Sequence, residues 1–71
     1  MCEATVFLAS GGRERKIMEN VVAMRPEGDC IFLADLLGEQ RLVRAQIKDV
    51  DLLHHRVVLE EVPAAEAPEP R

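Results

Sequence analysis

The sequence predicts a small all-β domain, an antiparallel barrel of the SH3-like or Sm-like kind. Its apolar runs are short, and turn residues interrupt them often, which is typical of a small barrel or sandwich rather than a helical bundle. Apolar residues make up 48% of the chain, but there are only two Phe and no Trp or Tyr. The core of this domain is therefore expected to be aliphatic, built from Val, Leu and Ile.

The first part of the chain divides into strands at clear turn signals. Residues 2–8 combine alternation with β-branched and aromatic side chains and are expected to form the first strand. Ser10-Gly11-Gly12 predicts a turn. Residues 13–18 are expected to form a short polar strand that Asn20 breaks, and residues 21–25 to begin another strand.

The middle of the chain continues the same pattern. Pro26-Glu27-Gly28-Asp29 predicts a tight turn, because Pro presets φ and Gly permits a positive φ. Residues 30–34 are nearly all apolar and are expected to form a central strand buried on both faces. After a reversal at residues 37–39, residues 42–48 alternate like a strand with one buried face. The alternation changes phase at Lys48-Asp49, which predicts a β-bulge or a bend.

The last predicted hairpin turns at His54-His55, and residues 56–62 are expected to form the final strand. From Pro63 the chain has no large apolar side chain and is rich in Pro, Ala and Glu. The sequence therefore predicts one domain over residues 1–62 and a disordered tail over residues 63–71.

The size and net charge of the chain limit the classes of function that the sequence allows. A chain of 71 residues buries roughly 60% of its unfolded surface, so such domains often depend on a metal, a disulfide or a partner subunit. The net charge of −4 argues against a nucleic-acid-binding protein, whose affinity depends on basic residues. Neither a secretory signal nor a membrane span is recognisable. We expect a cytoplasmic protein with reduced thiols.

Cys2 is the most informative position because its thiolate lies next to the terminal amine. A thiolate, an amine and an intervening amide nitrogen form fused chelate rings that suit square-planar Ni(II) or Cu(II). If Met1 is removed, the amine belongs to Cys2 itself. If Met1 stays, its amine and the Cys2 amide are both within reach. The other interpretation is that Cys2 only begins a strand as a small residue.

The order of several short motifs resembles the CooT family of small nickel-binding proteins. The opening Met1-Cys2-Glu3-Ala4-Thr5-Val6-Phe7-Leu8 is similar to the family's start, and the resemblance extends over about residues 1–62. No single motif is highly specific, but their order, the chain length and the cysteine in second position are jointly specific. The further matching segments are Ile17-Met18-Glu19-Asn20-Val21, Glu27-Gly28, Leu37-Gly38-Glu39 and Ile47-Lys48-Asp49-Val50-Asp51-Leu52.

The resemblance implies a homodimer that binds Ni(II) at the subunit interface around Cys2, with Met1 contributing only through its backbone and amine. It also implies a metallochaperone or nickel-storage role, with a client nickel enzyme such as carbon monoxide dehydrogenase. No catalytic or phosphate-binding motif is present, so no enzymatic activity is expected. The alternatives are a small-barrel RNA-binding protein and a metal-free protein-interaction module, since a fold does not settle a function.

Three other groups of residues have simpler interpretations. Cys30 lies in an apolar segment and is expected to behave as a small buried hydrophobe. His54 and His55 are expected to lie in a solvated turn; neighbouring side chains of a regular strand point to opposite faces, although in a turn both could face one ion. Whether either His contributes a ligand stays open. The acidic residues of the last two strands match no calcium loop and are expected to face solvent.

Overall fold

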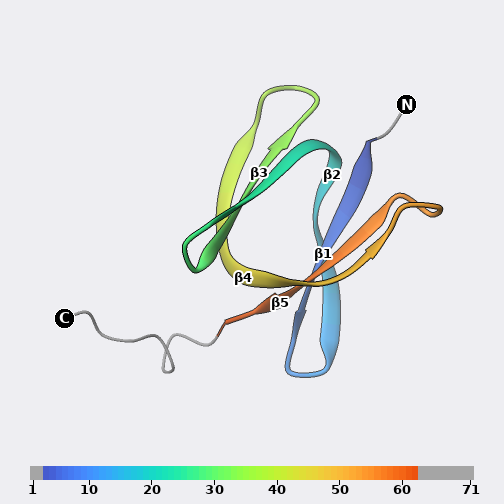
Figure 1. Ribbon diagram of the computed structural model, residues 1–71. Helices are drawn as coiled ribbons and strands as arrows, with labels where there is room; N and C mark the ends of the chain where they lie inside the picture. The colour runs from blue at the N-terminus through green and yellow to red at the C-terminus, as the bar shows by residue number, and fades with distance from the viewer. Residues whose placement is uncertain (1–2, 63–71) are drawn as a thin grey trace.

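The computed structural model describes residues 3–62, and the regular secondary structure in this part is all strand (Figure 1). The all-β prediction is therefore confirmed. No helix among these residues is long and apolar enough to cross a membrane. Met1, Cys2 and the predicted tail over residues 63–71 lie outside the described residues. The five strands are β1 (Ala4–Ser10), β2 (Arg13–Glu27), β3 (Cys30–Asp35), β4 (Gln40–Asp51) and β5 (Arg56–Glu61).

The strands follow one another as hairpins and close into a barrel in the order β1-β2-β3-β4-β5 (Figure 1). The four pairs of consecutive strands are antiparallel, as expected. The pair that closes the barrel, β1 with β5, is parallel and runs from Thr5–Arg56 to Ala9–Glu60. This difference from an all-antiparallel barrel follows from the strand number, because the first and fifth strands of a hairpin meander point the same way.

An aliphatic core fills the barrel, as the composition predicts. Val6, Leu33 and Leu59 are fully buried. Each comes from a different strand. Val6 and Leu33 alternate with less buried neighbours, which is the period-two pattern of a strand with one buried face, whereas β5 has three consecutive buried residues, Val57, Val58 and Leu59. The rest of the buried cluster consists of Leu8, Met18, Val21, Ile31, Ala45 and Val57.

Asn20 does not break the second strand, contrary to the sequence prediction. β2 continues through it to Glu27, and Asn20 adopts a φ of 57°. The pairing of β2 with β3 shifts register between Val21 and Ala23. Asn tolerates the left-handed region better than most residues, and an irregularity of this kind bends a strand without ending it. β2 can therefore pair with β1 along its first half and with β3 along its second.

The prediction that residues 30–34 are buried on both faces is wrong. Within β3, Ile31 and Leu33 are buried, whereas Cys30 and Phe32 are half-buried. The guanidinium of Arg25 covers the outward face of Phe32, 4.7 Å from the ring centroid. An apolar side chain on the outside of a barrel can thus be shielded from water by an arginine side chain, without a second layer of secondary structure packed over it. Cys30 lies outside the buried core cluster, so it is not the buried hydrophobe that was expected.

The phase change near Lys48 is confirmed as an irregularity in β4. The pairing of β4 with β5 shifts register between Ile47 and Asp49. On the preceding segment the predicted inward face is only partly buried: Ala45 is buried, but Ile47 is 43% exposed. The turn predicted around His54 and His55 is also present, between Asp51 and Arg56.

Core packing generates the first prediction. Leu33→Ala removes a fully buried side chain and should lower the free energy of unfolding by about 2–5 kcal/mol, because the transfer energy is lost and a cavity remains. Leu42→Ala is the matched control, since Leu42 is 60% exposed, and its effect should stay within about 0.5 kcal/mol. Urea denaturation followed by circular dichroism measures both. Equal losses would contradict the assignment of Leu33 to the core.

Candidate functional site

The start of β1 lies between two irregular parts of the barrel. On one side, Ala4 pairs with Val21 next to the bend in β2. On the other side, the Thr5 amide donates a hydrogen bond of 2.8 Å to the carbonyl oxygen of His55, in the turn between β4 and β5. The point at which the chain enters the barrel is therefore held beside this turn (Figure 1).

Exposed apolar side chains gather around this entry point. The turn between β4 and β5 presents Leu52 and Leu53, which are 80% and 82% exposed. The turn between β3 and β4 presents Leu36 and Leu37 and is tied to the bend of β2 by a hydrogen bond from the Leu36 amide to the Asn20 carbonyl. Both turns lie on the side of the barrel where β1 begins (Figure 1). We call this surface the apolar rim: Val22, Leu36, Leu37, Leu52 and Leu53.

A shallow depression of about 150 Å³ adjoins the rim at the start of β1. Its lining is almost entirely aliphatic and includes Ala4 of β1, Val22 and Met24 of β2, and Val57 of β5. Large exposed apolar areas on a small protein mark places where another molecule binds. The rim and the depression together therefore form a candidate contact surface around the N-terminal end of the described chain.

Asp51 and His54 form an organised polar pair within the same turn. One carboxylate oxygen of Asp51 accepts a hydrogen bond from the His54 amide at 3.2 Å, and the other lies 2.9 Å from the Nδ1 atom of the His54 ring. The ring's hydrogen bond is the largest cause that lowers the pKa of the Asp51 carboxyl, so this carboxyl stays ionised at neutral pH. Sequence analysis missed this pair, although an Asp three residues before a turn His is a spacing typical of a side-chain-capped turn.

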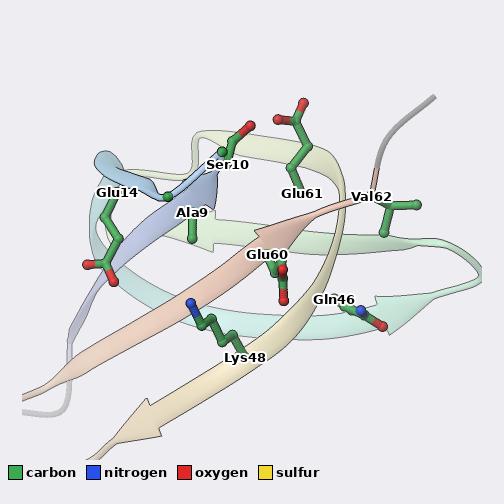
Figure 2. Close-up of a pocket in the computed structure, with 10 residues that line it drawn as sticks. Ala9, Ser10, Glu14, Gln46, Lys48, Glu60, Glu61 and Val62 are labelled. Atoms are coloured by element: carbon green, nitrogen blue, oxygen red, sulfur yellow. The ribbon is translucent and has the colours of Figure 1, made fainter. Parts of the chain in front are cut away.

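The opposite end of the barrel is polar. A hollow of about 590 Å³ opens there between the β1–β2 hairpin, the middle of β4 and the end of β5. Figure 2 shows Glu14, Gln46, Lys48 and Glu60 around this hollow. Charges of both signs line it, and no single chemical class of ligand is favoured.

Both phenylalanines have an arginine stacked against them. The guanidinium of Arg56 lies 4.5 Å from the centroid of Phe7 and also donates a hydrogen bond of 2.7 Å to Glu14. Arg25 covers Phe32 in the same way, as described above. A protein that binds single-stranded nucleic acid offers open aromatic faces to the bases. Here the stacked arginines occupy that position, and one of them is neutralised by a carboxylate.

The predicted metal ligands, Cys2 and the amine of Met1, lie outside the described residues. Within residues 3–62, no three His, Cys, Asp or Glu side chains are grouped so as to hold a metal ion. Cys30 is the first residue of β3, where it is half-buried and pairs with Glu27 of β2. In the sequence, Cys2 directly precedes Glu3, the first described residue, and β1 begins one residue later beside the apolar rim.

Comparison with known proteins agrees with this architecture. The family model for the CO dehydrogenase accessory protein CooT matches residues 1–60. An uncharacterized protein of Archaeoglobus fulgidus is 40% identical over 43 residues, which cover 61% of this chain and 96% of that protein. The crystal structure of a CooT candidate from Carboxydothermus hydrogenoformans matches with a TM-score of 0.80 and 31% identity, over 87% of this chain and 100% of that one. The chain therefore belongs to the CooT family of CO dehydrogenase accessory proteins.

Proposed function

We propose that this protein carries Ni(II) as cargo for the maturation of a nickel enzyme such as carbon monoxide dehydrogenase. The ion is bound through the Cys2 thiolate at the interface of a homodimer. Membership of an accessory-protein family supports the role in maturation. The observation that carries the metal-binding part is the position of the start of β1, which lies at the apolar rim.

The distribution of donor groups supports Cys2 as the ligand. Residues 3–62 contain no ready-made cluster of metal-binding side chains, so a metal site in this protein needs donors from elsewhere in the chain or from a second subunit. Cys2 and the neighbouring backbone nitrogens supply a thiolate and nitrogen donors, a set that suits Ni(II). A site at the end of a chain is also open to ligand exchange with a client enzyme, as transfer of a cargo ion requires.

The apolar rim supports the homodimer. Leu37, Leu52 and Leu53 are each at least 80% exposed, and burying such side chains stabilises an interface by about 25 cal/mol per Å² of apolar surface. A twofold axis brings the same surface of two subunits together. Because the rim surrounds the start of β1, a dimer formed through the rim brings the two chain starts near each other, where two thiolates can share one ion.

The alternatives receive less support. RNA binding requires stacking faces and positive charge, whereas both Phe side chains are covered by arginines and the chain has a net charge of −4. A metal-free interaction module would use the same apolar rim but would not respond to nickel. Titration with nickel therefore separates this module from the proposed carrier.

Cys2→Ala tests the ligand directly. Reduced wild-type protein should show a thiolate-to-nickel charge-transfer absorption band, and the variant should lose both the band and most of the calorimetric affinity. Wild-type affinity should also fall as the pH is lowered, because protons compete for the thiolate. Cys30→Ala is the matched control and should keep the band. An unchanged band in Cys2→Ala would overturn the assignment.

Leu53→Asp tests the dimer. Chelator-treated wild-type protein should have about twice the chain mass by light scattering at micromolar concentration. Leu53→Asp places a charge in the proposed interface and should shift the mass toward one chain. Leu42→Asp is the control, because Leu42 is also exposed but lies outside the rim. A monomeric wild-type protein would refute the dimer.

Changes at the two chain ends separate the metal site from the predicted tail. Deletion of residues 63–71 should leave nickel affinity and mass unchanged, because this segment lacks the apolar residues needed to offset its ordering entropy. A residue added before Met1 should alter the charge-transfer spectrum if the terminal amine is a donor, while a residue added after Arg71 should not. Loss of nickel binding on tail deletion would contradict the location of the site.

A further inference from the structure

Closure of the barrel pairs the edges of β1 and β5, but the first half of β2 extends past the end of β3. Residues 13–18 pair with β1, whereas the pairing of β2 with β3 begins at Val21 and Asp35. Among the described residues, the edge of residues 13–19 that faces away from β1 therefore has no strand beside it. Unpaired N–H and C=O groups at such an edge can pair with a strand of another molecule.

A hollow of about 350 Å³ lies along this open edge. Its lining comes from residues 16–20 of β2 and from Asp35 and Glu39, at the two ends of the β3–β4 turn. At Asn20 the edge is closed, because the carbonyl of this residue accepts a hydrogen bond of 2.9 Å from the Leu36 amide. The part of the edge before Asn20 thus borders a space in which an extended segment can lie.

The guanidinium of Arg41 occupies this part of the edge. Arg41 lies near the start of β4, where it pairs with Leu33 of β3, and its Nη1 atom donates a hydrogen bond of 2.8 Å to the carbonyl oxygen of Ile17. The side chain thus takes the position at which the N–H group of an added strand would donate. An added strand would have to displace this guanidinium and then lie beside a positive charge, which makes pairing unfavourable.

Two further features oppose pairing at the same edge. The pairing with β1 shifts register at Ile17, which is an extra residue in β2 without a partner in β1. Lys16 and Glu19 form an exposed ion pair. Bulges and charged side chains are the means by which natural proteins protect strand edges. Of these features, Arg41 is the one that covers a backbone carbonyl of the edge.

We infer that Arg41 protects the open edge of β2 against antiparallel pairing with a second copy of this chain. A second copy is the occupant that the charges favour, because an antiparallel pair centred on Ile17 sets Arg15 of each copy opposite Glu19 of the other. The two Ile17 side chains, each half-buried, lie opposite each other at its centre. This inference is separate from the proposed nickel site and from the apolar rim, because it uses none of their residues.

Arg41→Met removes the guanidinium but keeps an unbranched side chain, so it tests the protection directly. In chelator-treated, reduced full-length protein at micromolar concentration, light scattering should give this variant about twice the mass of the wild type, because two copies join through β2. Hydrogen exchange should show new protection of amides within residues 13–19. Arg41→Lys keeps a cationic donor and should have the mass of the wild type. Arg41→Gln should associate as Arg41→Met does, and it takes the place of that variant if circular dichroism shows Arg41→Met to be unfolded.

Arg44→Met is the matched control, because Arg44 lies on the same strand and forms an exposed ion pair with Asp29. Its mass should equal that of the wild type. The inference fails if the folded Arg41 variants keep the wild-type mass, or if Arg44→Met associates as strongly as they do. It also fails if the new protection lies in residues 46–51 of β4, which likewise have one strand neighbour. Each mass is compared with that of the wild type, so failure here leaves the proposed function standing, and a monomeric wild type leaves this inference standing.

Discussion

Pairing of β1 with β5, from Thr5–Arg56 to Ala9–Glu60, joins two strands that would otherwise be the outer edges of a five-stranded sheet. Closure removes free strand edges and wraps the sheet around a core small enough for aliphatic side chains to fill. It also fixes which distant residues become neighbours. The start of β1 meets the β4–β5 turn because β1 and β5 run parallel, so that both begin at the same end of the barrel.

Register shifts in β2 and β4, the two longest strands, help this short chain to close into a barrel. The bend at Asn20 lets β2 pair with β1 and then with β3. β4 pairs with β3 as far as Arg44 and with β5 from Ala45 onward, and its register with β5 shifts between Ile47 and Asp49. Bulges increase local twist and bend a strand, which small barrels require. The β2 bend also helps to form the apolar rim, because it brings Val22 to the surface beside the start of β1.

The inside of the barrel and the end at which β1 begins have different roles. The strands enclose an aliphatic core in which no polar or charged side chain of the described residues is buried, while the apolar rim supplies the surface on which the proposed dimer depends. Four of the five residues of the apolar rim lie in the β3–β4 and β4–β5 turns, where they are exposed to contact with another protein.

Local signals in the sequence determined the strands, the hairpin turns, the aliphatic core and the bulge near Lys48, because each depends on residues close together in the chain. The same signals, with the order of short motifs, indicated the family. They failed at Asn20 and at residues 30–34, where pairing with neighbouring strands outweighed local preference and Arg25 replaced a second buried layer. Only the tertiary structure decided which turns lie beside the start of β1 and that Asp51 orients His54 there. The place of these turns beside β1 depends on barrel closure, which brings residues about fifty positions apart in the chain into contact. Contacts between such distant residues leave no local pattern in the sequence.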